Sequence, residues 1–158
     1  MNLGSKMIID ATVKPRHTEL SNTHVTEERL RHMRELDHRI LDINLAHDTL
    51  LLVKVRGQGM PVLEKLVKHT ELGRTKIIAA VSDDVDIRDR ENYIWGIFTR
   101  FDCERDIIFT EQRMMGISPI YKGIMGIDAT WKEGYPKPLR MSDEVVKRVE
   151  ERWDSYWK

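Results

Sequence analysis

Short apolar runs alternate with stretches of helical spacing along the second two-thirds of the chain. Nearly continuous apolar runs at residues 49–55, 76–81 and 107–109 have the composition of strands that are covered on both faces. Between them, apolar residues recur three and four positions apart from Pro61 to Val67 and from about Asp89 to Phe101. Strands that alternate with helices of this length predict right-handed βαβ units around a short, mostly parallel sheet.

Each end of this region predicts one amphipathic helix. Thr26 is a suitable N-cap for a helix that continues to about Leu41, and a short strand candidate precedes it at residues 6–9. A last helix begins at Ser142, and its apolar face consists of Val145, Val146, Val149 and Trp153, extended by Tyr156 and Trp157. The whole pattern predicts an α/β fold, a three-layer sandwich with a C-terminal helix. Residues 1–48 would form an N-terminal extension, and residues 49–158 the α/β domain.

A loop is predicted between the third strand and the C-terminal part of the chain, at residues 111–123. It carries Met114, Met115, Ile117, Pro119 and Tyr121. Flexible thioethers adapt to flat ligands and contact aromatic rings well, so these side chains are candidates for the wall of an apolar pocket. The same residues would equally serve to cover the end of the sheet, and both interpretations stay open.

The amino-acid composition limits the kinds of partner and the compartment that are expected for this protein. The 158 residues include 26 Lys plus Arg and 26 Asp plus Glu, a balance that argues against nucleic acid or an anionic membrane as the main partner. The single cysteine, Cys103, has no partner for an internal disulfide, and this favours a reducing compartment. Neither a signal peptide nor an apolar run of membrane-spanning length is present in the sequence, so a cytoplasmic protein is expected.

Two motifs are candidates for ligand binding, and each also has a purely structural interpretation. The acidic turn with Asp83, Asp84, Asp86 and Asp89 offers carboxylates to a divalent cation, but its spacing fits no calcium loop, and a turn in which one Asp caps the next helix explains it better. Gly57 and Gly59 stand between a strand and a helix, where a phosphate-binding turn would lie. The third glycine of that fingerprint is replaced by Val62, so nucleotide binding is the weaker interpretation. No metal site is predicted.

Several spaced segments resemble one family in a single order. They are Val81 to Asp86 with Arg88-Asp89, then Ile94 to Arg100, Arg105-Asp106, Met125 to Thr130 and Lys137 to Leu139. In this order they resemble the C-terminal domain of the UbiD-like reversible decarboxylases, which use prenylated flavin. The likeness runs from about Thr49 to Trp157. The Asp-Ala-Thr segment at Gly123 to Thr130 is also echoed at Gly4 to Thr12, either by chance or as a second piece of the same family motif.

The resemblance implies part of an enzyme that adds or removes a carboxylate on an aromatic or unsaturated acid. In the family, prenylated flavin and a Glu–Arg–Glu set belong to a separate, larger domain that precedes this one. The 48 leading residues are too few for that domain, so no catalytic residue is carried over and no cofactor is expected on this chain alone. Prenylated FMN is expected on a larger UbiD-like catalytic subunit. The resemblance assigns the segment from Met114 to Tyr121 to one wall of the substrate pocket.

Two functions follow from these observations. The first is a small accessory subunit of a UbiD-like aromatic carboxylase or decarboxylase, which supports assembly and part of the substrate pocket. The second is a stand-alone module for homo-oligomerisation with no catalytic role. The last helix motivates the second, because Val149, Trp153 and Trp157 offer a large apolar surface to a partner. In either case a homo- or hetero-oligomer is expected.

Overall fold

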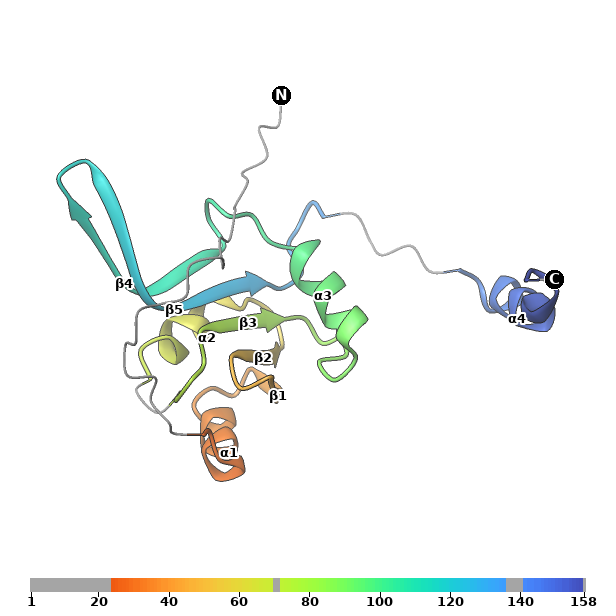
Figure 1. The fold of residues 1–158 in the computed structure, drawn as a ribbon, viewed down its shortest axis with the longest axis horizontal. Helices are drawn as coiled ribbons and strands as arrows, with labels where there is room; N and C mark the ends of the chain where they lie inside the picture. The colour runs from red at the N-terminus through yellow and green to blue at the C-terminus, as the bar shows by residue number, and fades with distance from the viewer. Residues whose placement is uncertain (1–23, 70–71, 136–140, 158) are drawn as a thin grey trace.

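A computed structural model describes residues 24–69, 72–135 and 141–157. Four α-helices, five strands and one short 3-10 helix (η1) follow one another in this part of the chain (Figure 1). In chain order they are α1 (Glu27–Glu35), β1 (Ile40–Ala46), β2 (Leu50–Val55), α2 (Met60–Leu66), β3 (Ile77–Val81), α3 (Arg90–Phe98), β4 (Ile107–Met115), β5 (Ser118–Ala129), α4 (Asp143–Arg152) and η1 (Trp153–Ser155). The α/β class and the C-terminal helix are confirmed.

The five strands form one mixed sheet in the order β1-β2-β3-β5-β4. Its centre is parallel, because β3 pairs in parallel with both β2 and β5. Both edges are antiparallel, because β1 and β4 reach their neighbours through short turns, and a short turn permits only antiparallel pairing. The β1–β2 turn places His47 and Asp48 at positive φ, a conformation that tight hairpin turns use.

The two faces of the sheet carry separate apolar cores. One core joins Met33 of α1 and Leu63 of α2 to strand residues such as Leu51 and Val53. The other joins Tyr93 and Ile97 of α3 to residues of the opposite strand face, and Leu52, Ala79 and Ile127 are among them. Side chains alternate along a strand, so the nearly continuous apolar runs of β2 and β3 supply both cores at once. The three-layer arrangement predicted from the sequence is therefore confirmed.

One predicted helix is too long. The first helix ends at Glu35 and not near Leu41, because residues 40–46 form edge strand β1. The apolar residues Ile40, Ile43 and Leu45 follow a spacing that is compatible with helix or strand over so short a run. The sheet thus takes an edge strand from the segment that the sequence prediction assigned to the N-terminal extension. The strand candidate at residues 6–9 lies outside the described residues.

The predicted loop at residues 111–123 is a β-hairpin, and this corrects the sequence prediction. β4 continues from Ile107 to Met115, and β5 begins at Ser118 after a two-residue turn in which Gly116 has φ 63°. The polar run Glu111-Gln112-Arg113 concealed the strand, because neither face of this segment is buried. Figure 1 shows the hairpin as an arm that extends beyond the other strands.

The helices after β3 differ in how they pack. α3 begins after Asp89, whose side chain accepts the backbone N–H of Asn92, so the predicted capping role of an Asp in this turn is confirmed. The helix ends at Phe98, and the last residues of the predicted helix form a turn. α4 has no buried residue, and Figure 1 shows it beyond the carboxyl ends of the parallel strands, apart from the other helices.

Candidate functional site

The carboxyl ends of the three parallel strands gather the polar segments of the fold. β2 is followed by residues 56–59, β3 by residues 82–84, and β5 ends in Asp128 and Ala129 before Thr130. In open α/β sheets ligands bind at this edge, so its polar groups are the first candidates for function. The role of this edge depends on whether its polar groups are free to bind a ligand or are bonded to one another.

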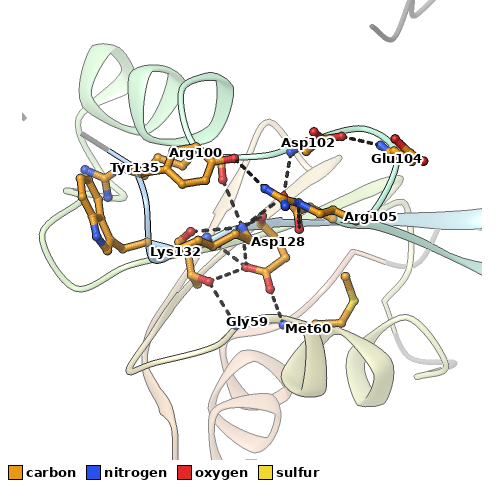
Figure 2. A network of polar contacts seen from close by, with 12 residues as sticks. Gly59, Met60, Arg100, Asp102, Glu104, Arg105, Asp128, Lys132 and Tyr135 are labelled. Carbon is orange, nitrogen blue, oxygen red and sulfur yellow. Dashed lines mark hydrogen bonds and ion pairs between the residues drawn. The ribbon is translucent and has the colours of Figure 1, made fainter. Parts of the chain in front are cut away.

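Asp128 ties the end of β5 to the start of α2. One carboxylate oxygen accepts the backbone N–H of Met60 at 2.7 Å. The other accepts the backbone N–H of Thr130 at 3.0 Å and its hydroxyl at 2.6 Å (Figure 2). The Thr130 hydroxyl oxygen in turn accepts the backbone N–H of Gly59 at 3.3 Å. Both side chains are buried, so the Asp-Ala-Thr segment acts as a cap on α2.

Gly59 makes this close approach possible. A Cβ atom built at this position would lie 2.6 Å from a carboxylate oxygen of Asp128 and 2.7 Å from the Cβ of Ala80. The two backbone N–H groups that a phosphate would need, those of Gly59 and Met60, already bind Thr130 and Asp128. The glycine turn therefore serves helix packing, and the weaker nucleotide interpretation loses its structural basis.

Lys132 joins the loop after α3 to the same edge. Its ammonium donates to the backbone carbonyls of Asp128 at 2.7 Å and of Arg100 at 3.1 Å. It also lies 3.3 Å from a carboxylate oxygen of Asp106, a buried residue whose side chain accepts the backbone N–H of Asp102 (Figure 2). The network therefore fixes the 99–106 loop against the end of β5.

The acidic turn after β3 is also paired within the chain. Arg100 donates to both carboxylate oxygens of Asp84 at 2.7 Å, and its guanidinium lies 5.0 Å from the ring centroid of Trp131. Asp86 accepts the backbone N–H of Arg88. In the described ranges no three His, Cys, Asp or Glu side chains are grouped as a metal ion would require. These carboxylates therefore hold a turn in place.

A second buried carboxylate lies beside the edge strand β1. Asp37, between α1 and β1, accepts the guanidinium of Arg39 at 2.7 and 2.8 Å and the ammonium of Lys65 at 2.7 Å. The hydrogen bonds from Arg39 hold the pKa of Asp37 far below its usual range, and Lys65 on α2 acts in the same direction. This cluster was not singled out from the sequence. It binds the corner before β1 to α2.

The structure divides the predicted pocket residues between two faces of the hairpin. Cross-strand partners share a face of a hairpin. On one face Gln112 pairs with Tyr121, and Met114 pairs with Pro119. Tyr121 also stacks on Phe109, with ring centroids 4.7 Å apart. We call these five residues the aromatic face of the hairpin. Met115 belongs to the other face, with Arg113 and the oppositely charged pair Glu111 and Lys122, and Ile117 lies in the turn.

The predicted interface residues lie close in sequence at the end of the described chain: Val149 on α4, Trp153 in η1 and Trp157 just after η1. A shallow apolar hollow is lined by Met141, Val146, Val149 and Trp153, with Glu150 and Asp154 at its border. The rings of Trp153 and Trp157 meet edge to face at 5.8 Å between centroids. Val149, Trp153 and Trp157 therefore form one exposed surface. A second exposed apolar surface, formed by Ile94, Trp95 and Phe98 of α3, was not singled out from the sequence.

A known family model covers the sheet and most of the carboxyl edge described above. The model of the 3-octaprenyl-4-hydroxybenzoate carboxy-lyase C-terminal domain matches residues 32–129. This range holds every strand of the sheet and the Asp-Ala segment that caps α2. The chain belongs to the UbiD family. The resemblance inferred from the spaced motifs is confirmed.

Sequence relatives of this UbiD-family chain are longer proteins. An uncharacterized protein of Archaeoglobus fulgidus is 30% identical over 143 residues, which cover 77% of this chain and 30% of the relative. An uncharacterized protein of Aeropyrum pernix is also 30% identical, over 113 residues that cover 63% of this chain and 23% of the relative. The chain thus spans less than a third of the length of these relatives.

Solved structures share the fold. The UbiD-class enzyme HmfF from Pelotomaculum thermopropionicum, in an evolved dimeric form with prFMN, gives a TM-score of 0.54 at 18% identity over 76% of this chain and 27% of HmfF. The open form of vanillic acid decarboxylase (ShVdcCD) from Sedimentibacter hydroxybenzoicus gives 0.53 at 20% identity over 82% of this chain and 32% of that one. At such identities the likeness shows the fold of this UbiD-family chain.

The Asp-Ala-Thr segment of the family match has a near-copy at the start of the chain, and the structure shows what its residues bond to. Aligned on Asp-Ala-Thr, Met7 to Lys14 matches Met125 to Lys132 at six of eight positions, and the structure gives Asp128, Thr130 and Lys132 their bonding roles. One mismatch is decisive, because Ile8 stands at the position of Gly126. A Cβ there would lie 2.7 Å from Ile108, so the first copy cannot replace the second in this sheet. Residues 7–14 lie outside the described residues.

Membrane insertion receives no support from the helices of this UbiD-family chain. Among the residues that the structure describes, no helix has the length and apolar character that a bilayer span requires.

Proposed function

We propose that this chain is an accessory, non-catalytic part of a UbiD-like prenylated-flavin-dependent carboxylase or decarboxylase. Its family match supports the reaction class, and the small share of whole UbiD-class enzymes that it covers supports a division of labour. The chain corresponds to 27% of HmfF and 32% of the vanillic acid decarboxylase chain. The remaining majority of such an enzyme is the place for flavin and for acid–base chemistry, and here it belongs to a larger catalytic subunit.

The observation that carries this proposal is the self-contained bonding at the carboxyl edge. A flavin phosphate would need backbone N–H groups such as those of Gly59 and Met60, and Thr130 and Asp128 already bind them. The Gly59–Met60 turn therefore has no free N–H group to offer a flavin phosphate, and we derive no step through the cofactor on this chain. HmfF has been solved with prFMN and with FMN, and we assign the prenylated FMN of the assembly to the catalytic partner.

Within the assembly, the hairpin supplies one wall of the substrate pocket. Apart from Gln112 its aromatic face is apolar, Met114 and Tyr121 on it are exposed, and the hairpin extends away from the domain (Figure 1). Met114, Pro119 and Tyr121 would contact the ring of an aromatic acid, and the Phe109 ring holds Tyr121 in place. Met115 lies on the opposite face and Ile117 in the turn, so neither belongs to this wall.

The apolar surface of α4 holds the assembly together. Val149 lies on α4, and Trp153 and Trp157 lie in and just after η1. Neither helix has a buried residue, and a helix as short as α4 is marginal in water without a partner. The vanillic acid decarboxylase ShVdcCD has also been solved with a truncated ShVdcD, so an enzyme of this fold contains a second, named component. This supports a multi-subunit arrangement for the present chain.

Purification of the tagged full-length chain from its native source tests the proposal. We expect a larger UbiD-like protein with bound flavin to co-purify. The complex should release carbon dioxide from an aromatic acid, and the isolated chain should release none. Adding the chain back to the isolated catalytic partner should raise turnover. Purification of the chain without such a partner, or unchanged turnover of the partner after its addition, would overturn the proposal.

The alternative function is a stand-alone homo-oligomerisation module, which the exposed tryptophans of α4 favour. In that case the chain would form a defined oligomer, no catalytic protein would co-purify, and the hairpin residues would have no effect on any decarboxylation. The same purification therefore separates the two functions.

A further inference from the structure

The hairpin bends where it leaves the sheet. The register of β4 against β5 shifts between Phe109 and Glu111, so that Thr110 faces two residues of β5, Gly123 and Ile124. Two residues opposite one is the arrangement of a β-bulge. Gly123 has φ 85°, a conformation that favours glycine. A bulge of this kind bends its strand and increases the local twist, so it sets a new direction for the strands beyond it.

The part of the hairpin beyond the bend has no core of its own. We call this part, residues 111–122, the arm. Its side chains are exposed except for that of Ile120, which is half-buried. An isolated two-stranded hairpin is marginally stable in water, and the pairing of its own strands does not fix its direction relative to a sheet. The contacts at the base of the arm therefore decide where the arm points.

The side chain of Thr110 ties the bend to the end of α2. Its hydroxyl donates to the backbone carbonyl of Val67 at 2.7 Å and accepts the backbone N–H of Ile124 at 3.0 Å. Val67 is the C-cap of α2, and carbonyls at a helix end have no partner within the helix. Its side chain is buried in the core that α2 shares with the sheet. One hydroxyl thus joins the bulge to a fixed point of the domain.

Two neighbours of Thr110 constrain the same bend. A Cβ atom built at Gly123 would lie 2.7 Å from the Cβ of Thr110 and 2.8 Å from its hydroxyl oxygen, so only glycine leaves room for this approach. The ring of Phe109 stacks on that of Tyr121 with 4.7 Å between centroids. Phe109 precedes the bend and Tyr121 belongs to the arm, so the stack spans the bend beside the threonine.

We propose that Thr110 is a positioning residue that sets the direction of the arm. The inference rests on the proposed function in one respect: where the arm is a wall of the substrate pocket, Thr110 places that wall. The arm extends about 20 Å from the bend, so a change of about 15° in its direction displaces the tip by about 5 Å. Met114 lies near the tip, and apolar contacts need heavy atoms within about 4.5 Å, so such a displacement breaks its contact with a bound ring.

Spin-label distances within the full-length chain test the direction of the arm without a catalytic partner. Labels attached through Glu64→Cys on α2 and Ile117→Cys in the turn, in a Cys103→Ser background, report the distance from the domain to the tip. Both labelled positions are exposed. The parent arm should give one narrow distance distribution. Thr110→Val keeps the shape of the side chain and removes the hydroxyl, and it should shift or broaden this distribution by about 5 Å.

Three further substitutions separate positioning from a general loss of stability. Thr110→Ser keeps the hydroxyl and should retain the parental distribution. Thr99→Val is the matched control, because it removes a threonine hydroxyl that donates to the carbonyl of Trp95 at 2.6 Å, at the end of another helix. It should leave the distribution unchanged. Gly123→Ala, in which the added methyl group would collide with Thr110, should displace the tip as Thr110→Val does.

Kinetics of the complex with the catalytic partner show what the direction of the arm does. Thr110→Val should raise KM for the aromatic acid roughly fivefold and leave kcat within about twofold, because the wall contacts the ring and not the bond that breaks. Thr110→Ser and Thr99→Val should leave both constants within about twofold of the parent values.

Three results would overturn the inference. They are a parental distance distribution in Thr110→Val, an equal disturbance in Thr99→Val, and a Thr110→Ser variant that behaves like Thr110→Val. If the arm moves in Thr110→Val but neither this variant nor Tyr121→Ala changes KM, the hairpin is not the pocket wall of the proposed function, and the positioning role stands. If Tyr121→Ala raises KM while Thr110→Val leaves both the arm and KM unchanged, the proposed function stands and the inference fails.

Discussion

The carboxylate of Asp128 accepts the backbone N–H of Met60 at 2.7 Å, and this bond joins the end of β5 to the start of α2 across 68 residues of chain. The first N–H groups of a helix have no partner within the helix, so they need an acceptor from elsewhere. Here a buried acid from the family motif supplies it. The motif therefore maintains the fold at the edge where other α/β proteins bind ligands.

Replacing Asp128 should destabilise the domain without changing its surface chemistry. Asp128→Ala removes the acceptor of three hydrogen bonds, and we expect a loss of about 2–3 kcal/mol in the free energy of unfolding. Asp128→Asn keeps one acceptor oxygen and should lose less. Urea denaturation followed by circular dichroism measures both. Asp83→Ala, an exposed acid at the same edge, should stay within about 0.5 kcal/mol of the parent; an equal loss there would contradict the capping role.

Gly59 should tolerate no side chain. In Gly59→Ala the added methyl group would meet Asp128 and Ala80 at sub-contact distances, so we expect a loss of about 1–3 kcal/mol from overpacking. Gln58→Ala, at the exposed neighbouring position, is the control and should be nearly neutral. Because the N–H groups of this turn are occupied, adenine nucleotides should not change the melting temperature of the parent protein. A rise of several degrees would restore the phosphate-binding interpretation.

The contribution of Asp37 to the free energy of unfolding should depend on pH. Its pKa is depressed in the folded protein, so its contribution is complete above the unfolded pKa of about 3.9 and is lost as pH falls below that value. Asp37→Asn should therefore be less stable than the parent at pH 7, by about 1–3 kcal/mol, and the gap should close toward pH 2. Urea midpoints across this pH range measure it. A constant gap would show that the charge of Asp37 has no part in stability.

The layered fold was predictable because its signals are local. The apolar runs at β2 and β3 are buried on both faces, and their short length between turn residues indicates strands, because a buried helix would need a run of ten or more residues. The N-caps Thr26 and Asp89 were predictable for the same reason, since each bonds within three residues. β1 was missed, because Ile40 and Leu41 continue the helical spacing of the apolar residues that precede them.

The hairpin and the polar clusters depend on partners distant in sequence. Glu111, Gln112 and Arg113 are all exposed, so strand pairing alone holds them and no hydrophobic pattern reveals it. Asp37 meets Lys65 across 28 residues, and a single sequence gives no sign of that contact. The two faces of the hairpin follow from cross-strand register, which fixes that Met114 and Tyr121 share a face and that Met115 does not.

The hairpin faces give the sharpest functional prediction. Tyr121→Ala and Met114→Ala change the aromatic face, so in the complex with the catalytic partner they should raise KM for the aromatic acid roughly tenfold, the effect of losing about 1–2 kcal/mol of ring contact. Met115→Ala, on the opposite face and equally exposed, is the matched control and should leave KM within about twofold. Steady-state carbon dioxide release measures these values. If Met115→Ala raises KM as much as Met114→Ala, the aromatic face is not the wall of the pocket.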